Sequence, residues 1–251
     1  YQRRVRGIIM KLFVLTGQIG SGKSTVSKML NQKRCAIIDS DIITRELQQP
    51  GQKCLRQLVS AFGSQILDGQ ALNRKKLGEM VFSDPQKLKL LNWIMHKSIS
   101  RCIMLEIARV TLGYQQKFGL PADCAKIQSP KFVCLELPLY FEAKLNFHCP
   151  VVNVGVSDQK FLEERICARD GQAGVSRLKS QLSLQEREKR ADFALRNDDF
   201  EKLESKVDEL LSFVEGARNN ILETCKNVLI FVIIIVLAML VLFFAKLSQK
   251  L

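Results

Sequence analysis

A glycine-rich octapeptide follows the first apolar run of this chain. The sequence GQIGSGKS at residues 17–24 matches the pattern G-x-x-x-x-G-K-[ST], and the run at residues 12–15 before it predicts a buried strand. The glycines let consecutive backbone N–H groups point at a phosphate, and the helix expected after them presents the positive end of its dipole. A chain built around this loop is expected to bind a nucleoside triphosphate.

The loop pattern assigns separate tasks to its last two residues. Lys23 would reach the β- and γ-phosphates of ATP, and the Ser24 hydroxyl would be a ligand of Mg²⁺. The alternative is a plain Gly/Ser turn, which the preceding strand and the following helix disfavour. The predicted ATP-binding residues are Gly17, Gly20, Ser21, Gly22, Lys23, Ser24 and Thr25.

Apolar, β-branched runs alternate with longer helical patterns in the rest of the chain. This alternation is typical of a parallel sheet covered by helices. The length of 251 residues suits one catalytic domain, expected at residues 10–218. We therefore expect an α/β fold of the P-loop kinase type. The predicted strands are 11–16, 35–39, 132–137, 151–156 and 193–195.

Two helical tracts interrupt the expected sheet. Residues 42–114 show helical spacing in most of their length and predict an inserted substrate-binding subdomain, with helices at 53–62, 74–81 and 85–112. Residues 158–181 carry several arginines around two glycines, which predicts a lid of two helices broken by a glycine turn.

Carboxylates follow two of the predicted strands. Asp39 and Asp41 end the second strand, at the sheet edge where such folds bind ligands, and a carboxylate there can orient an acceptor hydroxyl. The alternative for Asp41 is a helix N-cap. Glu136 ends the third strand, where an acidic residue can contact the Mg²⁺ shell, although aspartate is commoner there.

An unbroken apolar run of 18 residues occupies positions 228–245. Its length is just enough for a helix to cross a bilayer, and it lacks the polar stripe of a core helix. We expect a single transmembrane helix that tethers the protein to a lipid bilayer as a tail anchor. The catalytic domain would face the cytosol, on the mitochondrial outer membrane or the endoplasmic reticulum. We interpret the basic residues 1–9 as an N-terminal extension and assign them no role in the fold.

The net charge of +13 suits phosphate-rich ligands and an anionic membrane surface. The basic residues are scattered and lack the blocks of a nucleic-acid-binding arm, so no nucleic acid partner is expected. The eight cysteines contain no C-x-x-C pair, so no metal cluster or disulfide framework is expected.

Four blocks of the sequence resemble the dephospho-coenzyme A kinase family. They are the glycine-rich loop with Thr16 before it, IIDSD at 37–41 with REL at 45–47, LNRKKL at 72–77 running on to VFSDP at 81–85, and LPLYFE at 137–142. Arg177 with Gln181, and RAD at 190–192, also fit. The C-terminal apolar run resembles the eukaryotic proteins of this family, which also end in a hydrophobic segment.

This resemblance implies an enzyme that uses ATP and Mg²⁺ to phosphorylate the ribose 3′-hydroxyl of dephospho-coenzyme A. Asp41 would be the base, and the catalytic residues would be Lys23, Asp41, Arg165 and Arg169. Ser24 and Glu136 would hold the metal ion. The substrate-binding residues would be Asp41, Arg45, Arg74, His96 and Leu139. His96 could equally be packed in the core, and the lid arginines could be solvated helix charge.

Several positions depart from the family pattern. They are Gln18 for glycine, Lys97 for proline, Leu162 for a lid glutamine, Arg196 for an acidic residue and Glu136 for the commoner aspartate. Two other functions therefore stay open. One is a P-loop kinase for another small nucleotide or metabolite, and the other is a nucleotide-binding membrane scaffold with weakened catalysis.

Overall fold

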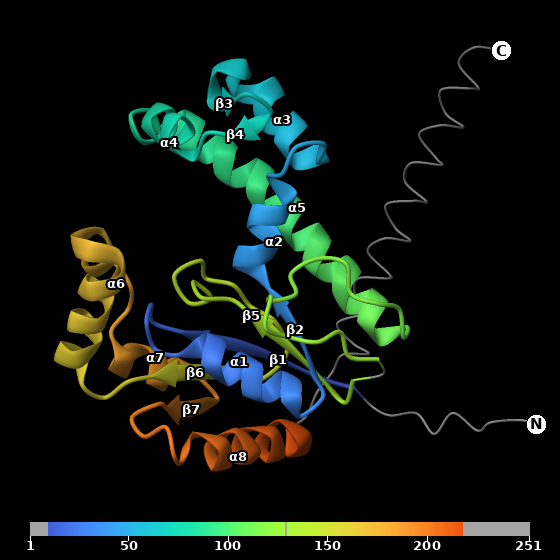
Figure 1. Cartoon of the computed structure of the whole chain (residues 1–251), viewed down its shortest axis with the longest axis vertical. Coiled ribbons are helices and arrows are strands. Elements are labelled where there is room, and N and C mark those ends of the chain that lie inside the picture. Colours follow the sequence, from blue (N-terminus) through green and yellow to red (C-terminus); the bar gives the residue numbers. More distant parts are fainter. Residues whose placement is uncertain (1–9, 129, 218–251) are drawn as a thin grey trace, which may run out of the picture.

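Five parallel strands form the central sheet of the protein (Figure 1). The computed structural model describes residues 10–128 and 130–217. The strand order is β2-β5-β1-β6-β7, so the strand that leads into the glycine-rich loop lies in the middle. All five predicted strands are confirmed to within one residue at either end. Their bounds are β1 Lys11–Gly17, β2 Cys35–Asp39, β5 Phe132–Glu136, β6 Val151–Gly155 and β7 Phe193–Arg196.

Both faces of strands β1, β2, β5 and β6 are buried, which is why these strands are nearly continuous apolar runs instead of alternating ones. The edge strand β7 is only partly buried. Phe13 and Leu15 point into a core that α1 (Lys23–Gln32) and α8 (Leu203–Gly216) close. Leu12 and Val14 point the other way, into a core shared with α5 (Pro85–Thr111). Strand β1 pairs with β5 and β6 in parallel register, so the loop after it leaves the sheet between their carboxyl ends.

The predicted helical tract at 42–114 is divided between two cores. Helix α2 (Ser40–Leu47) and the second half of α5 pack against the sheet. Helices α3 (Lys53–Phe62) and α4 (Arg74–Phe82) pack with the first half of α5 around Leu58, Phe62 and Ile94. Figure 1 shows this second group at the far end of α5, away from the sheet.

A small hairpin inside this tract was not predicted. A 3-10 turn (Ser64–Ile66) leads into β3 (Leu67–Asp68), which pairs antiparallel with β4 (Ala71–Leu72). The turn residue Gly69 has a φ of 61°, which glycine adopts without strain. The Asp-Gly dipeptide was the available sequence signal, but strands of two residues are too short for a periodic pattern.

The long helix α5 begins where its sequence provides a cap. Asp84 accepts hydrogen bonds from the backbone N–H groups of Gln86 and Lys87, at 2.9 and 3.2 Å, and Pro85 occupies the first turn. Proline suits that position because its missing N–H would have no partner there. From this start, α5 first contributes to the core that it shares with α3 and α4 and then to the core against the sheet.

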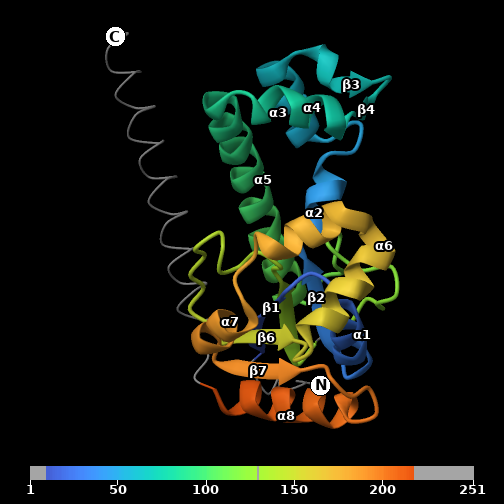
Figure 2. The ribbon, with the colours of Figure 1, turned by 90° about the vertical axis from the view of Figure 1, so that its left-hand side faces the viewer.

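The predicted lid is a helix interrupted by glycine. Helix α6 (Gln159–Lys179) is broken at Gly171, whose φ of 64° and ψ of −162° are not helical. Figure 2 shows its two parts meeting at an angle. Leu162, Ile166, Val175 and Leu178 pack these parts together, with Ile19 of the glycine-rich loop against them. The predicted break is confirmed.

The predicted transmembrane helix at 228–245 and the extension at 1–9 lie outside the described residues. Among the helices that the structure describes, in 10–128 and 130–217, none is both long and apolar enough to cross a bilayer.

Candidate active site

The glycine-rich loop opens directly into helix α1. Gly20 and Gly22 have φ values of 77° and 89°, in the left-handed region that favours glycine. Gly22 is the N-cap of α1 and makes no side-chain cap, and the first turn of the helix holds no acidic residue. The positive end of α1 is therefore open to an anion.

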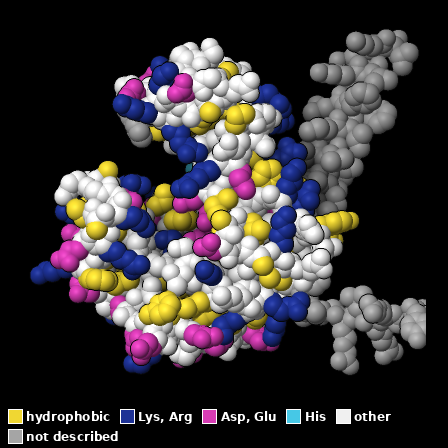
Figure 3. All heavy atoms as spheres, in the orientation of Figure 1, with side chains coloured by type: hydrophobic (Ala, Val, Ile, Leu, Met, Phe, Trp, Pro, Cys, Tyr) yellow, Lys and Arg dark blue, Asp and Glu magenta, His cyan; other side chains and the backbone are white. Residues whose placement is uncertain are grey.

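One cavity of about 450 Å³ connects this loop with the sheet edge and the lid. Most of the predicted site residues meet here, from elements far apart in the sequence. The space-filling view shows the hollow between the lid and the α2–α5 side of the molecule (Figure 3). The predicted residues that line it are Gly20, Gly22, Lys23, Ser24, Thr25, Asp41, Glu136, Leu139, Arg165 and Arg169. Arg177, Ser180, Gln181 and Pro138 join them and were not in the predicted set.

Asp39 and Asp41 have different positions at the end of β2. The Asp39 carboxylate accepts hydrogen bonds from the backbone N–H groups of Asp41 and Ile42, at 2.7 and 3.1 Å, and so caps helix α2. The alternative that Asp41 is the N-cap is therefore wrong, because the cap is Asp39, two residues earlier. Asp41 lies in the first turn of α2, and its exposed side chain lines the cavity.

A second cavity, of about 220 Å³, adjoins the first. Asp41, Pro138 and Leu139 line both, so the Asp41 side chain lies where the two cavities meet. The walls of the second cavity are mostly apolar, from α5 and the segment after β5. His96 lines it and is exposed, so it is not a packed core histidine. The arrangement suits a donor in one cavity and an acceptor in the other.

Lys23 is held against the loop that precedes it. Its Nζ donates to the carbonyl oxygens of Gly17 and Gln18, both at 2.9 Å. Burial lowers the pKa of Lys23 to about 8, although Glu136 nearby opposes the shift. A cation that has lost part of its hydration in this way gains strongly from a polyphosphate beside it.

Glu136 ends β5 in register with Asp39 on β2. The Ser27 hydroxyl donates to one of its oxygens at 2.6 Å. Burial, and then the neighbouring Asp39, raise the pKa of Glu136 to about 7, against the opposing effects of Ser27 and Lys23.

Ser24 and Glu136 fit the predicted role of holding Mg²⁺. Both residues line the same cavity and carry side-chain oxygens, which Mg²⁺ prefers as ligands. In the described part of the chain, no cluster of three or more His, Cys, Asp or Glu residues could form a dedicated cage. Mg²⁺ commonly binds instead through one or two protein oxygens together with substrate phosphates and water.

The raised pKa of Glu136 gives a prediction about stability. The folded protein keeps a proton on this group up to about pH 7, whereas the unfolded chain releases it near pH 4.5. The free energy of unfolding should therefore fall as pH rises through this window. Glu136→Gln should remove that slope, so the ligand-free variant should exceed the wild type in stability by more at pH 8 than at pH 5.

Urea denaturation of ligand-free protein at both pH values checks this expectation. Glu209→Gln, on the exposed side of α8 and outside the site, is the control variant. A stability difference between Glu136→Gln and wild type that stays the same at both pH values would contradict it.

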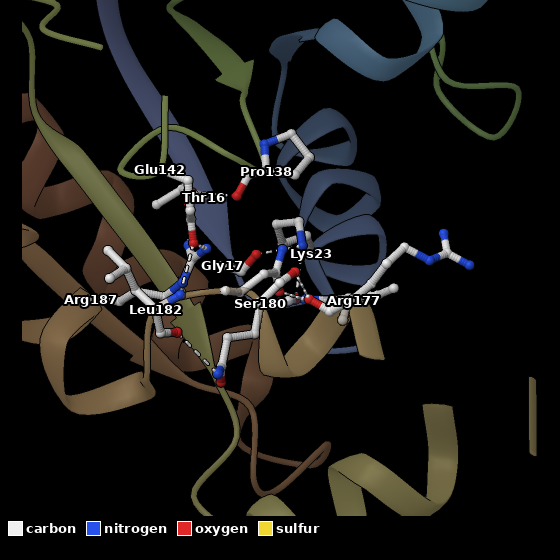
Figure 4. A network of polar contacts seen from close by, with 12 residues as sticks. Thr16, Gly17, Lys23, Pro138, Glu142, Arg177, Ser180, Leu182 and Arg187 are labelled. Atoms are coloured by element: carbon white, nitrogen blue, oxygen red, sulfur yellow. Dashed lines mark hydrogen bonds and ion pairs between the residues drawn. The ribbon is translucent and has the colours of Figure 1, made fainter. Parts of the chain in front are cut away.

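A buried ionic network fixes the base of the site (Figure 4). Arg187, from α7 (Leu184–Arg190), is fully buried and pairs with Glu142. It also donates to the Thr16 hydroxyl at 3.3 Å, and Thr16 donates to the Pro138 carbonyl at 3.2 Å. Glu142 accepts the backbone N–H of Leu182 at 3.0 Å. The network joins the residue before the loop to the segment that follows the lid.

Arg187 was not predicted, because one arginine in the polar helix LQEREKR gives no local signal of burial. Gln18, which departs from the family pattern, has a clear contact: its amide donates to the Leu182 carbonyl at 3.3 Å. The Ile19 N–H likewise donates to the Gln181 side chain at 2.9 Å. Both bonds link the loop to the base of the lid.

Two predicted substrate-binding residues do not reach either cavity. Arg45 is exposed on α2, and Arg74 donates to the Gln48 side chain at 3.1 Å at the start of α4. Their roles stay predictions.

A family model and similar sequences agree on one family. The family model described as dephospho-CoA kinase matches residues 11–202. A dephospho-CoA kinase from Lactobacillus johnsonii is 34% identical over 203 residues, which cover 78% of this chain and 94% of the relative. One from rice, Oryza sativa subsp. japonica, is 31% identical over 223 residues, covering 84% and 90%.

Solved structures show the same fold. A crystal structure from Thermus thermophilus has a TM-score of 0.66 at 25% identity and covers 83% of this chain and 99% of its own. The dephospho-CoA kinase of Campylobacter jejuni has a TM-score of 0.55 at 23% identity, covering 80% and 95%.

Proposed function

The chain belongs to the dephospho-CoA kinase family, and on that basis we propose that it transfers the γ-phosphoryl group of ATP to the ribose 3′-hydroxyl of dephospho-coenzyme A. The product would be coenzyme A. The observation that carries the proposal is the position of Asp41, at the junction of a cavity with a phosphate-binding loop and a second, largely apolar cavity.

The residues of the first cavity would divide the work of the transfer. The open N-terminus of α1 and Lys23 would hold the β- and γ-phosphates. Asp41 would orient the 3′-hydroxyl and take its proton as the new O–P bond forms and the bond to ADP breaks. Ser24 and Glu136 would hold Mg²⁺, which when bound supplies positive charge to the phosphate oxygens.

The lid arginines would neutralise charge on the transferred group. Among the described residues, Arg165 and Arg177 have no carboxylate within ion-pair distance, whereas Arg169 binds its neighbour Asp170 through two bonds of 3.1 and 2.8 Å. Arg165 and Arg177 are thus free to bind phosphate directly. Arg169 would first have to exchange its carboxylate partner.

Acceptor choice tests the proposal. ADP release by the full chain would be followed with dephospho-coenzyme A and with a panel of nucleosides, nucleotides and other small alcohols. We expect dephospho-coenzyme A to have the highest kcat/KM. A different acceptor with a higher value would favour the second kinase function, and nucleotide binding without turnover would favour the scaffold.

We also propose that the apolar run at 228–245 tethers the enzyme to a membrane, with its catalytic domain facing the cytosol. The run lies outside the described residues, and its support is the sequence alone: 18 apolar residues without a polar stripe. Either the mitochondrial outer membrane or the endoplasmic reticulum would suit it.

Deletion of residues 228–251 should release the protein from membranes with nearly unchanged kinase activity. The reason is that α8 closes the sheet core by residue 216, before the apolar run begins. Alkaline carbonate extraction and ADP release would be measured for both forms. Extraction of the full-length protein by carbonate, or misfolding of the truncated one, would show that the segment belongs to the globular core.

A further inference from the structure

A basic groove lies on the side of α5 opposite the second cavity of the candidate active site, and we propose that this groove binds a phosphate-bearing anion. We call that second cavity the acceptor cavity, and the first, which contains the glycine-rich loop, the nucleotide cavity. The groove has a volume of about 430 Å³, close to that of the nucleotide cavity. It is formed by the end of α2, the start of α3, one side of α5 and the loop at residues 117–118. It shares no lining residue with either cavity of the candidate active site.

Helix α5 separates the two sites by its periodicity. The acceptor cavity uses positions 96, 99, 100 and 103, whereas the groove uses positions 97, 98, 101, 102, 105, 106 and 109. At about 100° per residue these are two stripes on opposite sides of the helix. The groove is therefore a separate site and not an extension of the acceptor cavity.

The charge of the groove is strongly unbalanced. Five basic side chains and one carboxylate give its lining a formal net charge of +4. The space-filling view shows Lys and Arg side chains gathered along the α5 side of the molecule (Figure 3). The five basic residues are Lys53, Lys97, Arg101, Arg109 and Lys117, and all of them are exposed.

The single carboxylate does not neutralise this charge. Glu106 is buried, and its oxygens accept the Lys117 backbone N–H at 2.7 Å and lie 3.7 Å from the Arg109 guanidinium. Within the described residues, the other four basic side chains have no carboxylate in ion-pair distance. The excess of positive charge that is left attracts a polyanion.

Backbone donors point to the same ligand chemistry. Helix α3 begins at Lys53 inside the groove, its N-cap Gln52 makes no side-chain cap, and its first turn holds no acidic residue. Unfilled N–H groups and the positive helix end favour an anion, and several Lys and Arg donors beside them favour the multiple oxygens of a phosphate. The anion can be free in solution or the headgroup of a lipid.

A built-in reporter allows a direct test. Trp93 is the single tryptophan of the chain, and the Nζ of Lys97 in the groove lies 5.0 Å from the centre of its ring. The full chain in detergent, with its nucleotide cavity saturated by a non-hydrolysable ATP analogue and excess Mg²⁺, would be titrated with inorganic pyrophosphate. A parallel measurement would use the full chain reconstituted, after removal of detergent, into phosphatidylcholine vesicles with and without phosphatidic acid.

The test variant is Lys53→Gln/Arg101→Gln. Its matched control is Arg56→Gln/Lys76→Gln, which removes the same two charge types from exposed positions of α3 and α4 outside the groove. We expect a saturable change in Trp93 emission. The test variant should lower the apparent affinity for the anion about tenfold or more, because it loses charge-assisted hydrogen bonds to phosphate, and the control should not.

The outcomes separate the two sources of the anion and the failure of the proposal. A response to pyrophosphate supports a free anion, and a response confined to vesicles with phosphatidic acid supports a lipid headgroup. The absence of a saturable response to both probes would overturn the proposal. Equal weakening by the two double variants would also overturn it, because it would reduce the effect to general surface charge.

Discussion

Lys23→Ala is expected to remove nearly all kinase activity and to leave the protein folded. The Nζ of Lys23 donates hydrogen bonds to two loop carbonyls near the N-terminus of α1, where it would meet the β- and γ-phosphates. Loss of one preorganised charge at a transferring phosphoryl group costs about 10²–10³-fold in kcat or more. The fold should survive because Lys23 is not an apolar core residue.

The pKa of Lys23 supports the expectation that the alanine variant stays folded. Burial lowers it to about 8 from 10.5, so at neutral pH the fold carries a protonated amine in a site that disfavours its charge. This penalty on the free energy of unfolding is present below pH 8 and disappears as pH rises towards 10.5. The alanine variant should thus be no less stable than wild type near pH 7.

ADP release and thermal unfolding would be measured side by side, with Lys28→Ala on the exposed side of α1 as the control. Wild-type activity in a folded Lys23→Ala variant would refute the assignment of the loop.

Asp41→Asn should lower kcat by about 10²–10⁴-fold and leave the KM for ATP nearly unchanged. The reason is its position: Asp41 lies between the two cavities and would act on the acceptor hydroxyl, not on the nucleotide phosphates. An amide keeps the shape of the side chain but cannot take the proton. The KM for ATP and kcat therefore respond differently.

Asp39→Asn is the matched comparison. Asp39 caps α2, and asparagine is also a good N-cap, so its loss of charge should affect kcat far less. Steady-state kinetics of both variants would be compared under the same conditions. Equal loss of kcat in the two variants would contradict the assignment of Asp41 alone as the base.

The sheet was predictable because four of its five strands are largely apolar runs of five to seven residues between clear breaks. The loop was predictable because all its chemistry is contained in eight consecutive residues. The β3–β4 hairpin escaped because two residues cannot show a period, and its helical surroundings obscured the Asp-Gly turn.

The site was predictable only where its residues belong to recognisable local blocks. Arg187 depends on Glu142 and Thr16, which are 45 and 171 positions away, so its burial is a property of the fold and not of its helix. The division of labour between Asp39 and Asp41 depends on which residue starts α2. The junction of the two cavities at Asp41 likewise exists only once α5 and the segment after β5 come together.

Phosphorus NMR of the reaction product shows directly which atom of the acceptor receives the phosphoryl group. The full-length chain would be incubated with ATP, Mg²⁺ and dephospho-coenzyme A, and the product compared between wild type and Asp41→Asn. We expect a new phosphomonoester signal coupled to the ribose 3′ proton, which the wild type forms and the variant forms far more slowly. A phosphate on any other atom, or ATP consumed without a phosphorylated acceptor, would contradict it.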